Sequence, residues 1–184
     1  ASGVKGNQRS ADGETALHQA ARAGHLDVME WLLANGADTK EKGTGCGTPL
    51  QWAVSADQVK AARMLLDHGA DVNYPGTNEA TALYAAVSQG KEGMAKFLVS
   101  RGANVNAKAL YGSTPLHLAA SDGRTELVKL FISQGADVNA RAAYDATPLH
   151  GAVDRNHVEC VRLLIENGAD PALNGAENRD RRSQ

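Results

Sequence analysis

The chain has 184 residues, and its 19 Lys and Arg residues against 21 Asp and Glu residues give a formal net charge of −2. The one basic cluster is Arg179-Asp180-Arg181-Arg182, so the chain lacks the clustered cations that replace phosphate counterions, and we expect no nucleic-acid partner. No segment approaches the roughly 18 consecutive apolar residues of a membrane-spanning helix, so we expect no membrane insertion.

Two landmarks recur along the chain with the same spacing of 33 residues. One is a threonine that opens an apolar run, and the other is a Gly-Ala pair that closes one. They stand at Thr15, Thr48, Thr81, Thr114 and Thr147, and at Gly36, Gly69, Gly102, Gly135 and Gly168. Two landmarks that share one period indicate an array of structural repeats. We place a lead-in at 1–11, five repeats at 12–44, 45–77, 78–110, 111–143 and 144–176, and a polar tail at 177–184.

Each repeat is predicted to open with a short, alanine-rich helix. The threonine can cap this helix through its hydroxyl, and a proline at position 49, 115 or 148 suits the first helical turn. We expect the helix to end at a residue with left-handed backbone geometry. Glycine fills that position in three repeats, and Asp or Asn, which tolerate the geometry best after glycine, fills it in two: Gly24, Asp57, Gly90, Gly123 and Asn156.

A second helix follows, in which apolar residues lie three and four positions apart. Examples are Val28, Trp31 and Leu32 in the first repeat, and Leu127, Leu130 and Phe131 in the fourth. We expect one column of these residues to be core: Trp31, Met64, Phe97, Leu130 and Leu163. The helix should stop at the glycine of Gly-Ala-Asp. Because the remaining segment is too short for another helix, we expect a hairpin finger there.

This unit of helix, helix and finger resembles the ankyrin repeat. The family pattern is matched by Asp12-Gly13-Glu14-Thr15-Ala16-Leu17-His18, Thr114-Pro115-Leu116-His117-Leu118-Ala119-Ala120, Gly24-His25-Leu26-Asp27-Val28 and Gly69-Ala70-Asp71-Val72-Asn73. The resemblance implies an all-α ankyrin-repeat solenoid, a stack of antiparallel helix pairs with β-hairpin fingers. It also implies a curved surface that binds other proteins.

Departures from the family pattern occur at both ends of the array. In the family an asparagine ties adjacent fingers together, but Lys40 and Ala172 stand in that column in the first and last repeats. We therefore expect the finger at Gly43–Gly47 to be the loosest. The fifth repeat keeps apolar packing residues such as Val153, whereas a terminal repeat ought to turn a polar face outward. We hypothesise that the chain belongs to a longer array or is followed by another domain.

The histidines and carboxylates show no catalytic or metal-binding pattern. His18, His117 and His150 share one column, where the resemblance implies that the ring bonds the backbone. Adjacent members should lie about 8–10 Å apart, too far to share a zinc ion bound at about 2 Å. No nucleophile elbow or phosphate-binding loop is present. We expect no enzyme activity, no metal, no cofactor and no small-molecule substrate.

The candidate partner-binding residues lie on two sets of columns that face the hollow of an ankyrin-like stack. These sets are the finger tips and the exposed positions of the first helices. Tyr, Trp and Arg dominate binding hot spots because they bury much area and keep a polar group. We therefore select Arg22, Trp52, Tyr111, Tyr144 and Arg155, with Leu110 as apolar support. The alternatives are that Trp52 fills space beside Ala61 and Ala62, and that the tyrosines stack on each other.

Two asparagines are candidate modification sites by resemblance. Ankyrin-like segments with a leucine and a later Asp-Val-Asn are substrates of an asparaginyl hydroxylase, and the segments that end at Asn73 and Asn106 are similar. The alternative is that both asparagines serve only as hydrogen-bonding residues of the fingers.

The sequence as a whole favours a non-catalytic, monomeric protein-interaction module. The alternative is the targeting region of a larger enzyme or effector, for example a ubiquitin-ligase receptor. Cys46 and Cys160 lie several repeats apart, too far for a disulfide, which needs Cα atoms within about 7 Å. Few, unpaired cysteines fit a reducing compartment, so we expect a cytoplasmic or nuclear location.

Overall fold

The computed structural model describes residues 8–11, 13–43 and 47–172, and these contain ten α-helices. The chain divides into two compact units, residues 1–103 and 104–184. The first unit holds α1 (Ala16–Ala23), α2 (Leu26–Ala34), α3 (Pro49–Ser55), α4 (Val59–Asp67), α5 (Ala82–Ser88) and α6 (Glu92–Ser100), with a short 3-10 turn η1 (Thr77–Glu79). The second holds α7 (Pro115–Ser121), α8 (Thr125–Ser133), α9 (Pro148–Asp154) and α10 (Val158–Glu166), with the turns η2 (Leu110–Gly112) and η3 (Ala143–Asp145).

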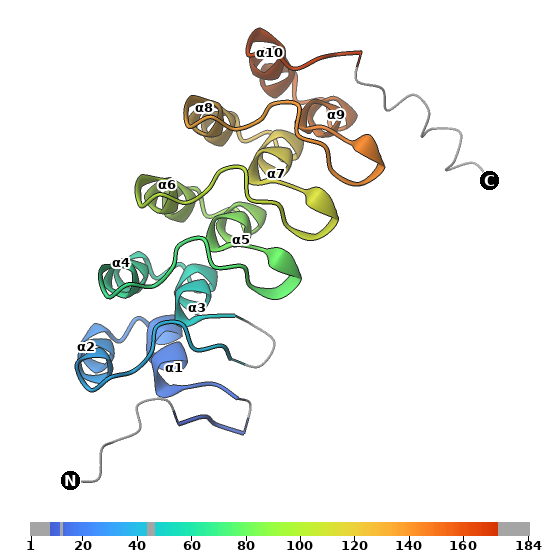
Figure 1. The fold of residues 1–184 in the computed structure, drawn as a ribbon. Helices are drawn as coiled ribbons and strands as arrows, with labels where there is room; N and C mark the ends of the chain where they lie inside the picture. The colour runs from blue at the N-terminus through green and yellow to red at the C-terminus, as the bar shows by residue number, and fades with distance from the viewer. Residues whose placement is uncertain (1–7, 12, 44–46, 173–184) are drawn as a thin grey trace. The chain divides into compact units, whose positions relative to one another are not determined.

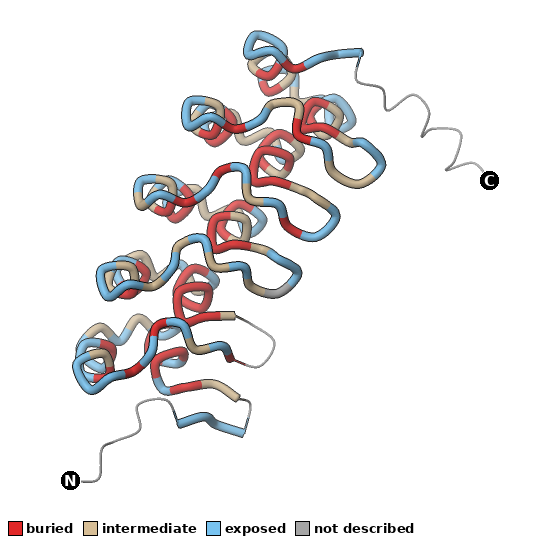
Figure 2. Tube along the Cα trace, in the orientation of Figure 1, coloured by how far each residue is buried: buried red, intermediate tan, exposed pale blue. Residues whose placement is uncertain are grey.

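Each unit is built from stacked helix pairs, as the repeat pattern predicts (Figure 1). In the first unit α1 packs on α3 and α3 on α5, while α2 packs on α4. In the second unit α7 packs on α9 and α8 on α10. Buried positions concentrate on the first helix of each pair (Figure 2), where Leu17, Leu50, Leu83, Leu116 and Leu149 occupy one buried column. The predicted all-α fold is confirmed.

The turn between the two helices of each pair has the predicted left-handed residue. The backbone φ angle is positive at all five predicted positions: Gly24, Asp57, Gly90, Gly123 and Asn156. The five glycines of the Gly-Ala pairs also have positive φ, and each follows the second helix closely. The ends of the first and the second helix could therefore be predicted from single residues, because few residue types tolerate this backbone geometry.

The prediction that Trp31 lies in the core is wrong. Its side chain is 53% exposed, and Met29 and Leu32 of α2 are the buried residues. Phe97, two repeats further along in the same column, is only half-buried, and the guanidinium carbons of Arg63 and Arg101 lie 4.9 and 5.8 Å from its ring centroid. This column therefore lies at the outer edge of the second helices, and in α6 arginines cover it. The sequence misled because neighbouring apolar residues, here Trp31 and Leu32, point in directions about 100° apart on a helix.

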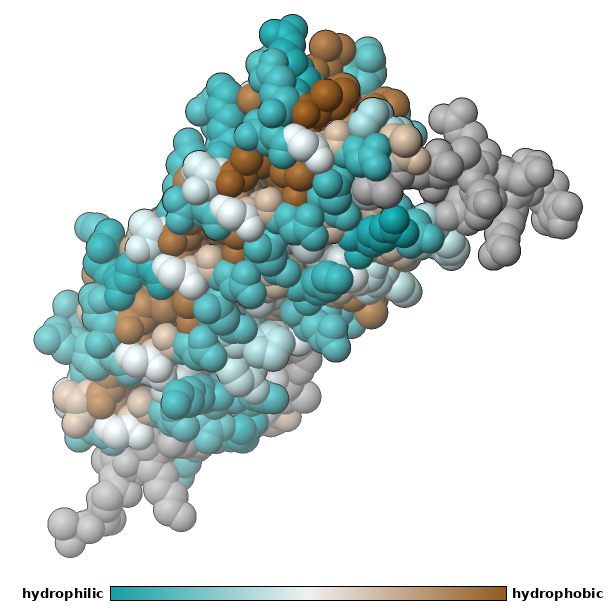
Figure 3. Space-filling model, turned by 45° about the horizontal axis from the view of Figure 1, so that its top comes forward, coloured by the Kyte–Doolittle hydropathy of each residue, from teal (hydrophilic) through white to brown (hydrophobic). Residues whose placement is uncertain are grey.

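Apolar residues are also exposed in the last described pair. Val153 is 54% exposed, although the residues at its position in the four earlier repeats, Ala21, Val54, Val87 and Ala120, are completely buried. Val158 and Ile165 are exposed as well. Exposed apolar groups lie among hydrophilic ones on the face drawn in Figure 3. The fifth repeat thus keeps the apolar character expected from its sequence.

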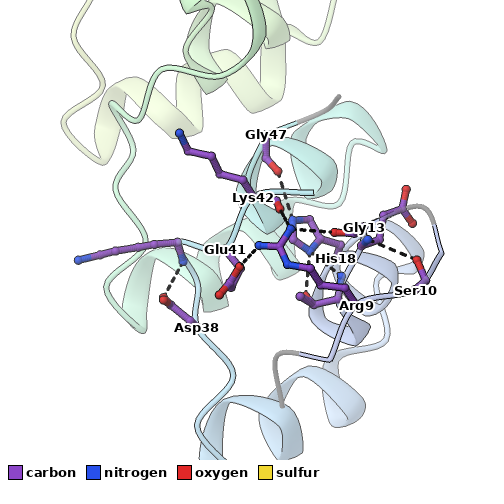
Figure 4. A network of polar contacts seen from close by, with 11 residues as sticks. Arg9, Ser10, Gly13, His18, Asp38, Glu41, Lys42 and Gly47 are labelled. Atoms are coloured by element: carbon purple, nitrogen blue, oxygen red, sulfur yellow. Dashed lines mark hydrogen bonds and ion pairs between the residues drawn. The ribbon is translucent and has the colours of Figure 1, made fainter. Parts of the chain in front are cut away.

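Two of the motif histidines, His18 and His117, link a helix cap to the following finger. The Nδ1 atom of His18 lies 3.2 Å from the backbone nitrogen of Thr15 and 2.8 Å from its hydroxyl oxygen, and Nε2 lies 3.2 Å from the carbonyl oxygen of Gly47. Because a backbone N–H can only donate, Nδ1 accepts, and the proton of the neutral ring is on Nε2, which donates to Gly47. Figure 4 shows this arrangement beside the guanidinium of Arg9, which donates to the Lys42 carbonyl at 2.5 Å and pairs with Glu41.

The same link recurs in the fourth repeat, and a glutamine forms it in the second. His117 accepts from the Thr114 backbone at 3.2 Å and donates to the Ala146 carbonyl at 3.1 Å. In the second repeat Gln51 accepts from the Thr48 backbone at 3.0 Å and donates to the Ala80 carbonyl at 3.0 Å. The Gln51 amide, which accepts through its oxygen and donates through its nitrogen, thus reproduces the two hydrogen bonds of a neutral imidazole. The structural interpretation of the motif histidines is confirmed.

The asparagine column forms a second link between successive repeats. Asn106 donates to the Gly135 carbonyl at 2.8 Å and accepts from the Asp137 backbone at 2.8 Å. Asn139 does the same with Gly168 and Asp170 at 2.9 Å each. The expected looseness of the finger at Gly43–Gly47 concerns residues 44–46, which lie outside the described residues.

We predict that acid destabilises the fold through His18 and His117. Burial lowers the pKa of both rings below the ordinary value of 6.5. The unfolded chain therefore binds more protons than the folded chain once the pH falls below about 6.5, and the free energy of unfolding decreases from there downward. The stabilising contribution of the two neutral rings is fully present above that pH. Urea unfolding between pH 8 and pH 5 measures the decrease.

The matched control is His117→Gln, which installs the side chain that the second repeat already uses. This variant should unfold with nearly wild-type free energy at pH 8 and lose less stability than the wild type at pH 5. An equal acid-induced loss in wild type and variant would contradict the role of His117.

Candidate partner-binding surfaces

The predicted site residues fall into the two units and form separate groups. Arg22 and Trp52 belong to the first unit, whereas Leu110, Tyr111, Tyr144 and Arg155 belong to the second.

In the first unit, Arg22 and Trp52 meet between α1 and α3. The guanidinium carbon of Arg22 lies 5.5 Å from the centroid of the Trp52 ring, a cation–π contact. The His18 ring meets Trp52 edge to face, with centroids 5.8 Å apart and planes at 79°. Arg22, Trp52, Ser55 and Ala56 line a hollow of about 330 Å³. The first helices therefore provide a concave, partly aromatic surface here.

Trp52 was predicted at an exposed position of its helix, but it is largely buried. Its side chain is only 8% exposed, and the ring contacts just described come from α1. The equivalent positions hold smaller or more flexible side chains, namely Gln19, Ala85, Leu118 and Gly151. The Trp52 ring thus forms a wall of the hollow and is largely buried.

In the second unit, Tyr111 and Tyr144 occupy the same position in successive finger tips. Tyr111 is 73% exposed and Tyr144 is 77% exposed. The fingers that carry them are closed by backbone hydrogen bonds, from Ala109 to the Ser113 carbonyl at 2.8 Å and from Ala142 to the Ala146 carbonyl at 2.9 Å. These bonds hold the turns η2 and η3, so each tyrosine projects from a defined turn.

Both tyrosines have backbone geometry that their residue type disfavours. Their φ angles are +63° and +58°, in the left-handed region, and Asn78 at the same position of η1 has φ of +57°. Asparagine tolerates this region, whereas a bulky residue there is uncommon and strained. Strained residues persist where the surrounding structure holds them, and they cluster at binding and catalytic sites. The exposed and strained tyrosines are therefore the strongest local indication of a binding surface.

The two remaining predicted residues lie close to the ends of elements. Leu110 begins η2 beside Tyr111 and is 45% exposed, so it extends the apolar area of that finger tip. Arg155 follows α9 directly, and its guanidinium lies 3.7 Å from the carboxylate of Asp122, which also pairs with Arg124 at 3.5 Å. Arg155 is thus engaged within the unit and is a weaker candidate for a partner contact than the tyrosines.

Ser55, an exposed position of a first helix that was not selected as a candidate, lines the hollow beside Trp52, and so does Ala56, which sequence reasoning missed. Sequence reasoning also did not anticipate the strain at Tyr111 and Tyr144. A signal for the strain was present, because the same column contains Asn78, a residue favoured at positive φ.

We predict that replacing the strained tyrosines with asparagine stabilises the second unit. Tyr144→Asn places at this position the residue that η1 already has, and should raise the free energy of unfolding by about 0.5–1 kcal/mol by removing the left-handed penalty. Chemical denaturation of the variant and the wild type measures the difference. Tyr144→Ala is the matched control, since it removes the ring but keeps a side chain that disfavours positive φ. Equal stability of the Asn and Ala variants would contradict the strain.

Other kinds of site are not evident in residues 8–11, 13–43 and 47–172. No group of three or more His, Cys, Asp or Glu side chains in this part of the chain could hold a metal ion. Over the same residues, no helix is long and apolar enough to cross a membrane.

Comparison with known proteins agrees with the repeat geometry. A family model described as ankyrin repeats in three copies matches residues 38–109 and 107–174, and a second model, ankyrin repeats in many copies, matches residues 4–53. No match to the chain was found among curated proteins. Ankyrin repeats are typically non-catalytic and generally serve in protein–protein interaction. The stacked helix pairs and the matches over most of the chain show that this protein belongs to the ankyrin repeat family.

Proposed function

We propose that this protein is a non-catalytic binding module that recognises a partner protein through its finger tips and the exposed side of its first helices, acting as a monomer. The observation that carries the proposal is the pair of exposed tyrosines at positive φ. Exposed aromatic side chains and unfavourable backbone geometry both oppose folding stability, so their coincidence in two successive fingers supports a role in binding.

The finger tips offer a partner rigid aromatic surface. Tyrosine supplies a large contact area with few rotatable bonds, and its hydroxyl can donate or accept a hydrogen bond. The turns η2 and η3 are closed by backbone hydrogen bonds at 2.8 and 2.9 Å, so less conformational entropy is lost when a partner binds. Leu110 adds apolar surface at the first of these tips.

The alternative of a targeting region within a larger enzyme uses the same surfaces. In either case the ankyrin repeats would select the partner, and any catalytic step would take place elsewhere. The proposal for these residues is therefore the same under both interpretations.

The proposal predicts that partner capture depends on the finger tyrosines. The chain, immobilised on beads, should retain a specific protein from a lysate of its source cells, and Tyr111→Asn with Tyr144→Asn should lose it. Asparagine is chosen because it suits positive φ, so the double variant is expected to fold at least as well as the wild type.

Val158→Thr is the matched control, since Val158 is an exposed apolar residue of the same unit that lies on α10, away from the fingers. It should retain the partner. Retention of the same proteins by the wild type and the tyrosine double variant would contradict the proposal.

We also propose Asn73 and Asn106 as hydroxylation sites, on the basis of the family resemblance. Both are exposed, and their side-chain amides donate to the Gly102 and Gly135 carbonyls at 3.2 and 2.8 Å. An enzyme must break these bonds to reach the side chain, so modification should be partial. Intact-mass measurement of the protein from cells that contain an asparaginyl hydroxylase should show added oxygen, which Asn73→Ala with Asn106→Ala removes. An unchanged mass in wild type would contradict this assignment.

A further inference from the structure

Trp52, which lines the hollow between α1 and α3, has a hydrogen-bond donor that lacks an acceptor. The indole nitrogen of Trp52 is buried and has no hydrogen-bond partner among the described residues. Bulk water does not satisfy it, because the atom is enclosed. A buried donor without an acceptor destabilises the folded state, so such groups are uncommon in folded proteins. Trp52 is also the largest residue that lines the hollow.

Arg22 is a second donor without an acidic partner. Most arginines in the described part of the chain pair with a carboxylate, namely Arg9, Arg101, Arg124, Arg141, Arg155 and Arg162. The described residues provide no such pair for Arg22, whose guanidinium lies over the Trp52 ring instead. Asp57, the residue after Ala56 of the hollow wall, does not pair with it. The guanidinium therefore keeps its donors available and is exposed enough to move with a ligand.

A further cation lies beside the hollow. The ammonium of Lys91 donates to the Val54 carbonyl at 3.0 Å and also to the Ser55 carbonyl. It thus caps the end of α3, where Ser55 and Ala56 line the hollow. The Lys91 ammonium also donates to Gln89 Oε1 at 2.5 Å, so its three donors are engaged and it contributes only its positive charge. The Arg22 guanidinium, this nearby charge and the unpartnered N–H favour a negatively charged group that accepts hydrogen bonds.

We infer that this hollow is a binding pocket for a carboxylate side chain, an Asp or Glu of a partner protein. The carboxylate accepts from the Arg22 guanidinium and from the Trp52 indole N–H once the two side chains adjust, and the stem of the acidic side chain packs on the indole face. The volume of about 330 Å³ is at the lower end of the range for ligand pockets and suits one side chain rather than a large ligand. This assignment rests on the proposed function and specifies what the first unit recognises.

The test uses the two tryptophans of the chain as separate probes. Each gives one indole N–H resonance in a ¹H–¹⁵N spectrum, and Trp31, which is 53% exposed, is the internal control for Trp52. Trp31→Phe assigns the two resonances. The probe is the capped peptide acetyl-Gly-Asp-Gly-amide in the millimolar range, compared with the same peptide carrying Asn or Lys in place of Asp.

The Asp peptide should shift the Trp52 resonance in a saturable manner and leave Trp31 unchanged. Arg22→Gln should weaken binding roughly tenfold, because a charge-assisted hydrogen bond is lost. Arg22→Lys keeps the charge and should lose less affinity for the Asp peptide than Arg22→Gln. An unshifted Trp52 resonance, equal shifts of both tryptophans, or equal binding of the Asp and Asn peptides would overturn the assignment. Since the titration needs no partner protein, its failure leaves the finger-tip proposal standing, and loss of partner capture can be judged separately.

Discussion

The structure depends on a side chain that accepts a hydrogen bond at one end and donates one at the other. In His18 and His117 the acceptor Nδ1 receives the backbone N–H that precedes the first helix, and Nε2 donates to the carbonyl of the next finger. The helix pairs that begin at α1 and α7 are thereby fastened to the finger of the next repeat. A charged ring cannot act as the acceptor, so the link requires a neutral histidine, or the glutamine that replaces it at Gln51.

This link holds the base of the finger that carries Tyr144. A finger that is fixed at its base by a motif side chain, and closed by its own backbone hydrogen bond, can present an exposed residue without collapsing onto the core. Tyr144 stands on a finger whose Ala146 carbonyl receives the bond from His117. Those contacts help to hold the positive φ of Tyr144.

Much of the fold could be predicted from single residues, whereas much of the surface could not. Thr114, Gly123 and Gly135 mark a cap, a turn and a helix end, and each does so because few residue types tolerate that position. Trp31 shows the limit, because an apolar periodicity reports which residues avoid water on average and does not say which edge of the helix faces the neighbouring pair. For Trp52 the sequence indicated the correct helix and surface, yet its burial depends on contacts with His18 and Arg22 of another repeat, which no local pattern contains.

The central claim is that the closed and strained fingers of the second unit contact the partner. Amide hydrogen exchange, measured on the chain alone and in complex with its captured partner, tests this claim most directly. The account predicts slower exchange on binding in residues 109–113 and 142–146, with little change in α8 and α10. Slower exchange across α8 and α10 with unchanged fingers would contradict it.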